Sequence, residues 1–349
     1  MRFGVGLFGL QNTAMLPAHW AGAYRDMREY AALMEELGYD ELWLSEHHFF
    51  YDGYCPALLP AAASVLSVTE RLRVGTGMML LPMQDPERLA AVSQDIHNRS
   101  GGRLDVGIGL GYRDIEFDGH GISRKQRLPR MLKGIEVLEA AEAAGGPPIW
   151  MGAQLIDPVK RAGQRGHPIL FSAALPFERC KTLTKVWEEG WVGAGRPLAS
   201  KPALGALRNI WLTEDPKERE AARDWVRASY VQYAGLGWTL PAVGEHEQAD
   251  FAEETDKAIA DTVETTITGS PPKGASANRA QPRKAMAKPP SPAAAARSAT
   301  NEPMAAHVSR PPFFRLGSRP LSWPSGALRS SVKAQSSRIK LPRLSIRSR

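Results

Sequence analysis

Short apolar runs alternate with longer segments of helical apolar spacing along the first 270 residues. The apolar runs are rich in Val, Leu and Met and predict strands buried on both faces. Met27, Ala31 and Met34 illustrate the helical spacing, and Gly38 marks a helix stop. The predicted strands are residues 2–9, 41–46, 72–81, 103–109, 148–153, 168–173 and 206–213. The predicted helices are residues 24–37, 57–68, 86–100, 125–144, 158–166, 177–191 and 216–235.

Seven strand–helix units in series predict an α/β fold, in which helices cover a parallel sheet. A doubly wound sheet and a closed barrel both fit this alternation. Seven successive units of about 25–35 residues favour the (β/α)8 TIM-barrel type, truncated here to about seven strands. In both architectures the reactive groups lie at the C-terminal ends of the strands.

The alternation ends after Asp261, and residues 263–268 fit either a strand or a loop. Beyond them, residues 271–349 hold 12 Pro and 13 Ser with no sustained apolar period. The formal net charge of +7 is unevenly spread, since 16 Lys and Arg against Glu302 alone give this tail +15 and leave −8 for the body. We therefore expect a barrel over residues 1–270 and a disordered, basic, Pro/Ser/Arg-rich tail over residues 271–349.

Cysteine usage and hydropathy favour a cytoplasmic protein. The two cysteines, Cys55 and Cys180, are too few for a disulfide framework. Residues 1–10 lack the charged start and the cleavage site of a signal peptide. The longest nearly apolar stretch, residues 56–68, is too short to cross a bilayer, so no membrane association is expected.

A pair of adjacent histidines follows the second predicted strand, in the sequence Glu46-His47-His48-Phe49. Barrels keep their catalytic groups at this end of a strand, and histidine exchanges protons near neutral pH. Adjacent residues of an extended segment point to opposite sides, so we expect one of the two to face the interior. The alternative is that both form hydrogen bonds within a loop. The other histidines show no ligand spacing, so no metal site is predicted.

Glycines interrupt the third and fourth predicted strands. Gly75 and Gly77 mark either a close approach of a ligand to bare backbone or a strand kinked for packing. Gly107, Gly109 and Gly111 give G-x-G-x-G, which differs from the dinucleotide fingerprint and from a P-loop. The fourth strand is therefore interpreted as an end against which a ligand packs.

A candidate phosphate site follows the fifth predicted strand, in the sequence Gly152-Ala153-Gln154. Backbone N–H groups that lead into a helix can hold a phosphate. Arg127, early in the preceding long helix, adds a charged group. The alternative for Arg127 is a solvated charge on a helix surface.

Taken in this order, the motifs resemble the bacterial luciferase-like flavin-dependent monooxygenases over about residues 1–270. Each piece is weak alone, but five in series at family spacing form a specific pattern. The segments that carry the resemblance are 2–6, 38–49, 74–82 with the following Asp85-Pro86, 100–104 with the Gly-rich strand, and 148–152.

The resemblance implies a TIM barrel that binds reduced FMN, or a deazaflavin coenzyme in one branch, and uses O2 on a small organic substrate. His47 matches the active-site histidine. The residues that match cofactor contacts are Glu46, Gly77, Met78, Gly109, Leu110, Arg127, Gly152, Ala153 and Gln154. It also implies a cis peptide bond at Gly77-Met78, a flavin reductase that supplies reduced FMN, and a homodimer as a usual assembly.

The chain departs from the family pattern at two places. Gln154-Leu155 stands where the family commonly has a serine, so a hydroxyl contact to the phosphate is lost. Residues 265–271 resemble the lead-in to a helix, an eighth strand and a last helix, which do not follow. A shifted reading frame near Pro271 would explain this, and a genuine disordered tail is the alternative.

Three other interpretations remain open beside the FMN-dependent monooxygenase. They are a deazaflavin-dependent oxidoreductase of the same fold, an inactive degenerate barrel with open sheet edges, and a binder of nucleic acid or another anionic polymer through the basic tail. The tail's aromatic residues do not interleave with its charges on any fold, which disfavours nucleic acid.

Overall fold

The computed structural model describes residues 1–8, 20–49, 54–235, 259–260 and 262–269. The chain divides into two compact units, Met1–Arg279 and Ala280–Arg349, of which the second lies outside the described residues. The predicted boundary at residue 270 and the predicted tail also lie outside them. The account below concerns the first unit.

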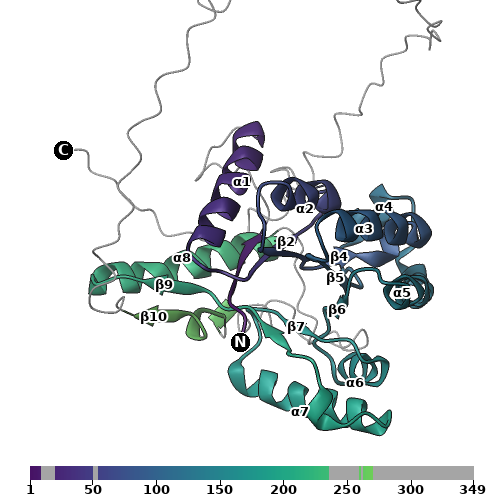
Figure 1. Cartoon of the computed structure of the whole chain (residues 1–349). Coiled ribbons are helices and arrows are strands. Elements are labelled where there is room, and N and C mark those ends of the chain that lie inside the picture. The colour runs from purple at the N-terminus through teal and green to yellow at the C-terminus, as the bar shows by residue number, and fades with distance from the viewer. Residues whose placement is uncertain (9–19, 50–53, 236–258, 261, 270–349) are drawn as a thin grey trace, which may run out of the picture. The chain divides into compact units, whose positions relative to one another are not determined.

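All described strands pair in parallel, as the βα alternation predicts (Figure 1). The main sheet has the order β1-β2-β3-β5-β4, and a further strand, β6, pairs with β5. Its strands are β1 (Gly4–Phe8), β2 (Glu41–Ser45), β3 (Arg73–Thr76), β4 (Met79–Leu80), β5 (Leu104–Gly109) and β6 (Ile149–Met151). Two further pairs are β7 (Leu170–Phe171) with β8 (Gly205–Ala206), and β9 (Ile210–Leu212) with β10 (Ile267–Gly269). A bridge between Met151 and Ile169 joins β6 to the start of β7.

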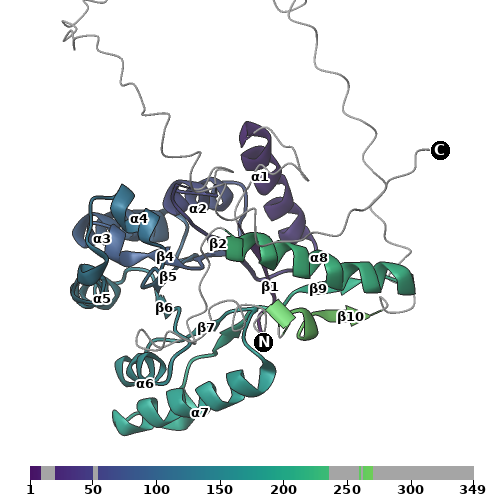
Figure 2. The same ribbon diagram turned by 180° about the vertical axis from the view of Figure 1, so that it is seen from behind.

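Helices separate the successive strands. They are α1 (Trp20–Glu36), α2 (Leu58–Leu66), α3 (Pro86–Arg99), α4 (Asp114–Gly119), α5 (Arg127–Ala143), α6 (Ile156–Arg165), α7 (Phe177–Gly193) and α8 (Pro216–Gly235). Both views show α6 beside α7, and α8 beside β9 and β10 (Figure 2). Among the described residues, no helix is long and apolar enough to cross a membrane.

The two faces of the sheet are both buried but differ in chemistry. On β2, Leu42 and Leu44 belong to the large apolar cluster shared with the helices. Trp43 points to the other face, where it meets Trp150 edge-on with ring centroids 5.2 Å apart and packs with Leu170. The alternation of strand side chains therefore separates a helix-covered outer face from an inner face filled by aromatic rings.

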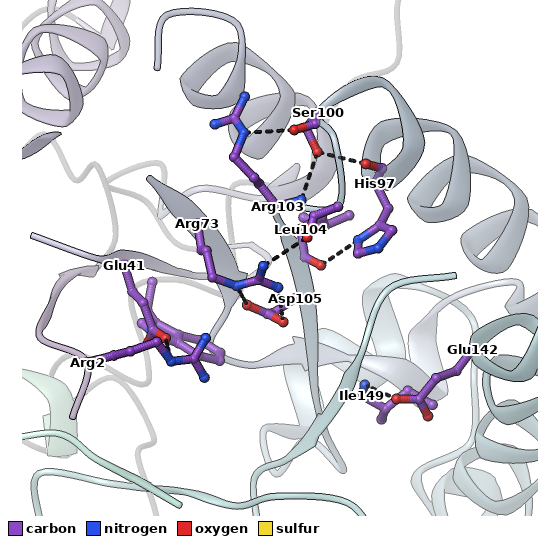
Figure 3. A network of polar contacts seen from close by, with 12 residues as sticks. Arg2, Glu41, Arg73, His97, Ser100, Arg103, Leu104, Asp105, Glu142 and Ile149 are labelled. Atoms are coloured by element: carbon purple, nitrogen blue, oxygen red, sulfur yellow. Dashed lines mark hydrogen bonds and ion pairs between the residues drawn. The ribbon is translucent and has the colours of Figure 1, made fainter. Parts of the chain in front are cut away.

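Charged residues occupy the N-terminal end of the inner face (Figure 3). Arg73 binds Asp105 with two hydrogen bonds, of 2.9 and 2.8 Å. Arg2 forms an ion pair with Glu41 at 2.8 Å, and Glu41 also accepts a hydrogen bond from Trp43 Nε1. This end of the strands is thus occupied by paired charges, which leaves the chemistry to the opposite end.

The structure corrects several element boundaries. The predicted third strand breaks at Gly77-Met78 into β3 and β4, and the seventh breaks at 207–209 into β8 and β9. The fifth predicted helix, α6 in the structure, begins at Ile156 rather than Pro158, and the short helix α4 was not predicted. Residues 263–268, left as strand or loop, comprise a helical turn that leads into β10.

The ring of strands is not closed by backbone pairing within the described residues. β1 pairs only with β2 there, and the β9–β10 pair is separate from the other sheets. The described strands fill eight positions of a barrel if β3 with β4, and β8 with β9, each count as one, and β10 takes the last of them beside β9. Ile210, Trp211 and Leu212 of β9 are all exposed, so the described residues leave their apolar side chains unburied.

Helices α6 and α7 approach each other through two glycines. A Cβ atom on Gly163 would overlap the carbonyl oxygen of Trp187, and one on Gly190 would overlap that of Lys160. The absence of side chains at these positions lets the two helix backbones touch. Trp187, which is fully buried beside this contact, donates a hydrogen bond to the carbonyl of His167.

The carboxylate of Glu35, at the end of α1, accepts hydrogen bonds from the three successive backbone N–H groups of Glu70, Arg71 and Leu72. Burial alone would raise the pKa of Glu35, but these three hydrogen bonds outweigh it and lower the pKa below 4.5. The carboxylate thereby fixes the turn that leads into β3.

We expect Glu35→Gln to lower the free energy of unfolding by about 1 kcal/mol at pH 7. A charged acceptor forms stronger hydrogen bonds than a neutral amide, but solvent screens the charge of Glu35 and keeps the loss small. The folded pKa lies below the unfolded one, so the stabilisation is complete above pH 4.5 and is lost as the pH falls through the folded pKa. Urea unfolding at pH 7 and at about pH 3 measures it. The exposed neighbour provides the control variant, Glu36→Gln, and equal losses in both variants would contradict the assignment.

Candidate active site

The segment after β2 packs on α4 through three consecutive residues. His47 contacts Glu116, the ring of His48 lies 4.7 Å from that of His120, and Phe49 packs against Gly119, where a Cβ atom would overlap the ring. Helix α4 follows β5, so the ends of β2 and β5, which lie on either side of β3 in the sheet, are joined here. The histidine pair is therefore held by an element that the sequence pattern did not reveal.

His47 is held at both ring nitrogens. Its Nδ1 lies 2.9 Å from Oε1 of Glu116, and its Nε2 lies 3.5 Å from the hydroxyl of Tyr112. The ring also meets Tyr54 edge-on, with centroids 4.8 Å apart. The imidazole thus has one position and one orientation at the C-terminal end of β2.

Glu116 is completely buried, with 0% of its surface exposed. Besides His47, its Oε1 accepts the backbone N–H of His48 at 2.8 Å, and Arg113 lies 3.8 Å away. Its Oε2 has no hydrogen-bond partner among the described residues. A buried carboxylate of this kind is costly without paired charges and hydrogen bonds, and it is a feature of functional sites.

Two tyrosines flank the histidine. Tyr54 shares a 3.0 Å hydrogen bond with Ser45, the last residue of β2. Burial, followed by the nearby charge of Glu116, raises the pKa of Tyr112 well above its ordinary value of 10. Tyr112 therefore keeps its hydroxyl proton throughout the neutral range and can donate it in a hydrogen bond.

Glu46 and His48 point away from His47. Glu46 accepts the backbone N–H of Leu80 at 2.7 Å, which ties the end of β2 to β4. His48 Nε2 is buried 3.6 Å from Glu46, without a hydrogen-bond partner in the described part of the chain. Burial, and then the neighbouring His48, lower the pKa of His120. The predicted contact of Glu46 with a cofactor remains a prediction, since its side chain binds the protein backbone.

The peptide bond between Gly77 and Met78 is cis, which confirms the expectation drawn from the family resemblance. The Met78 side chain lies against glycines of the adjacent strands. A Cβ atom would lie 2.6 Å from Met78 Cγ if built on Gly152, and 3.1 Å from Met78 Cβ if built on Gly109. These glycines make room for Met78, so that the ends of β4, β5 and β6 form a floor of backbone and one thioether.

The space over Gly75 is also occupied by the protein, because a Cβ atom there would overlap the ring of Trp43. This favours the packing interpretation for Gly75. Leu110, directly after β5, is partly buried and packs against the apolar core. Any contact of Gly109 and Leu110 with a cofactor stays a prediction.

The predicted phosphate residues lie at the C-terminal end of β6 and the start of α5. The N–H of Gly152 donates to the carbonyl of Ile108 at 2.9 Å. A phosphate would therefore be bound by the N–H groups of the next residues, Ala153 and Gln154. Arg127 is the first residue of α5, where burial and then Arg124 lower its pKa. Helix α6 begins directly after the turn, with no side-chain hydrogen bond at its N-cap, Leu155.

Sequence reasoning missed Glu116, Tyr112 and Tyr54. The signal for the first two was their position directly after the Gly-rich strand, at the end of a barrel strand. Glu116 is separated from His47 by 69 residues, so no local motif joins them. No group of three or more His, Cys, Asp or Glu is arranged for a metal within the residues that the structure describes.

A parallel β/α sheet with a histidine–carboxylate pair at the C-terminal strand ends defines a protein of the (β/α)-barrel class whose site lies at the strand ends. The family model of luciferase-like monooxygenases matches residues 1–288. The chain belongs to the luciferase-like monooxygenase family. The family resemblance and the α/β barrel fold inferred from the sequence are both confirmed.

Among curated relatives, the chain is similar to an alkanal monooxygenase alpha chain of Photorhabdus luminescens. The two are 30% identical over 181 residues, which are 45% of this chain and 50% of the relative. The chain thus spans about half the length of the relatives that it matches.

Three solved structures share the fold. Monooxygenase RslO1 of Streptomyces bottropensis has a TM-score of 0.60 and 21% identity, covering 77% of this chain and 91% of that one. The oxygenating constituent of 3,6-diketocamphane monooxygenase of Pseudomonas putida, in complex with FMN, has a TM-score of 0.56 and 15% identity, with coverages of 77% and 91%. The coenzyme F420-dependent tetrahydromethanopterin reductase of Methanopyrus kandleri has a TM-score of 0.53 and 18% identity, with coverages of 76% and 85%.

Proposed function

We propose that the protein is a flavin-dependent monooxygenase that uses reduced FMN and O2 to oxidise a small organic substrate. The observation that carries the proposal is the held His47, which lies at the end of β2 and is bound by Glu116 of α4, the helix that follows β5. Family membership supports oxidoreductase chemistry, and the FMN complex of a fold neighbour supports the choice of cofactor.

The residues present fit a flavin. A planar tricyclic ring needs a flat surface, and the Met78 side chain, seated over Gly109 and Gly152 after the cis bond, forms a floor of backbone and one thioether at three strand ends. A phosphate needs donors and positive charge. The backbone after Gly152 leads into α6, and Arg127 with Arg124 adds cations at the start of α5.

The bound reduced flavin supplies the two electrons by which O2 is activated. The protein's own contributions are binding, exclusion of water and movement of protons. His47 is the group placed to accept a proton from a substrate and to return it, since its Nδ1 is bound to Glu116 and its Nε2 faces the hydroxyl of Tyr112. Tyr54 and Tyr112 restrict the position of the imidazole.

Titration of the purified protein with FMN, followed by absorbance and fluorescence, tests the proposal. We expect saturation at a stoichiometry near one, and consumption of O2 when reduced FMN is supplied with a substrate. Failure of the folded protein to bind FMN or the deazaflavin would support the inactive, degenerate barrel instead.

The deazaflavin coenzyme is the second candidate, because one fold neighbour is an F420-dependent reductase. The same titration with the deazaflavin separates the two, and tighter binding of the deazaflavin with no use of O2 would favour it. A flavin reductase that supplies reduced FMN and a homodimeric assembly belong to the proposal, and analytical ultracentrifugation measures the latter.

A further inference from the structure

We propose that Glu116 is the positioning residue for His47: it fixes the imidazole as the tautomer that carries its hydrogen on Nδ1, so that Nε2 is the proton acceptor of the site. The inference rests on the proposed function for the meaning of the proton transfer. Its structural content concerns the flavin-free protein and is tested there.

The hydrogen bonds at Glu116 determine which nitrogen carries the hydrogen. Oε1 receives the backbone N–H of His48 at 2.8 Å, and this group is always a donor. The same oxygen lies 2.9 Å from Nδ1 of His47. A carboxylate oxygen carries no hydrogen, so it presents only lone pairs to both nitrogens. Nδ1 must therefore donate, and the neutral ring has its hydrogen there.

The opposite side of the ring agrees with this assignment. The hydroxyl of Tyr112 lies 3.5 Å from Nε2 and stays protonated in the neutral range, because burial raises its pKa. A hydroxyl donor requires a bare nitrogen as its acceptor. Tyr54 also meets the ring edge-on, and Arg113 lies 3.8 Å from Glu116.

The proton transfer follows from this arrangement. A substrate O–H bond breaks, the proton binds Nε2, and the electron pair stays on the substrate oxygen. The ring then carries one positive charge, while Nδ1 keeps its hydrogen bond to the carboxylate. The Glu116 carboxylate stabilises the imidazolium more than the neutral ring, because the two groups are 2.9 Å apart and Glu116 is buried away from solvent. Arg113 balances the carboxylate before the transfer.

A purely structural role is the competing account, since Glu116 also docks α4 on residues 47–49. Two substitutions separate the roles. In Glu116→Gln the His48 N–H keeps the amide oxygen in place, so the tautomer persists and only the charge is lost. In Glu116→Ala both acceptor and charge are lost. The matched control is Glu139→Gln, which changes the distant His167–Glu139 pair at 2.8 Å, close to the 2.9 Å of the His47–Glu116 pair.

The experiment is ¹⁵N NMR of the flavin-free protein labelled at its eight histidines, with His47 assigned from the spectrum of His47→Gln. Spectra are taken at about pH 8, above the ordinary histidine pKa of about 6.5. We expect His47 of the wild type, Glu116→Gln and Glu139→Gln to show the Nδ1–H tautomer. Glu116→Ala is expected to shift to Nε2–H, the more populated form of free histidine.

Turnover then divides the two contributions of Glu116. We expect the turnover rate to fall about 10-fold in Glu116→Gln. In Glu116→Ala we expect a fall of about 10²- to 10⁴-fold, because His47 is then no longer held as the base. An Nε2–H signal for His47 in the folded wild type overturns the proposal, as does an unchanged tautomer in folded Glu116→Ala. If Glu116→Ala does not fold, the wild-type and Glu116→Gln spectra still decide. A protein that binds no flavin yet shows the Nδ1–H pattern would refute the proposed function alone.

Discussion

An His47→Ala variant is expected to lose about 10²- to 10⁴-fold in turnover and to bind FMN nearly as well as the wild type. The first effect is the usual contribution of a positioned general acid or base. The second follows because the floor of Gly109, Gly152 and Met78 is formed by other strands and does not depend on the imidazole. Single-turnover oxidation with reduced FMN, alongside equilibrium FMN titration, measures both quantities.

Two further measurements make this result specific to His47. Added imidazole is expected to restore part of the turnover, because it can enter the space left by the side chain and accept the proton. His97→Ala is the control, since the ring of His97 binds the carbonyl of Leu104 at the N-terminal end of β5. Full turnover in His47→Ala would remove this residue from the chemistry.

A Gly163→Ala substitution is expected to lower the free energy of unfolding by about 3 kcal/mol, at the upper end of the usual range for overpacking. The added methyl group would overlap the carbonyl oxygen of Trp187, which is backbone and cannot rotate away. Helices α6 and α7 must then separate, which loosens the packing of the buried Trp187. Urea unfolding measures the loss, and the melting temperature falls by about 2–4 °C per kcal/mol in a domain of this size.

Gly193→Ala is the matched control on α7. A Cβ atom at Gly193 meets nothing within 4 Å, and alanine favours helix more than glycine does. We therefore expect this variant to be neutral or more stable by up to about 1 kcal/mol. A similar loss in both variants would show that the α6–α7 contact does not limit stability.

The strand–helix alternation could be predicted from sequence because buried strands and amphipathic helices leave different spacings of apolar residues. Leu42 and Leu44 face the helices while Trp43 fills the inner face, so the whole run reads as apolar. The position of His47 at a strand end followed from the same pattern. The cis bond at Gly77-Met78 needed the family resemblance, since no local spacing encodes it.

Helix α4 and the role of Glu116 could not be predicted in this way. Six residues, Asp114–Gly119, are too few to show a helical period, and four of them are charged or glycine. Glu116 is buried by residues at the end of another strand. The sequence next to Glu116 therefore carries no pattern from which this burial could be predicted. The same applies to the glycines, because the side chains that fill their space, Trp43 and Met78, come from other strands.

The break between β8 and β9 was missed for a different reason. The run from Ala206 to Leu212 looks like one strand, but Arg208 turns its guanidinium towards Cys180 and the carbonyl of Leu207. The chain then pairs β8 with β7 and β9 with β10. Pairing partners lie outside the local sequence, so a change of partner within one apolar run is invisible to periodicity.

All the candidate site residues lie between Glu46 and Gln154, on elements from β2 to the start of α6. About 200 residues of the chain are still to be made when Gln154 is added. At about 5–20 residues per second, a ribosome needs roughly 10–40 s for that remainder. The histidine–carboxylate pair and its glycine floor are thus synthesised well before the segment beyond residue 270. The residues of the candidate site can therefore begin to fold while the C-terminal part of the chain is still being translated.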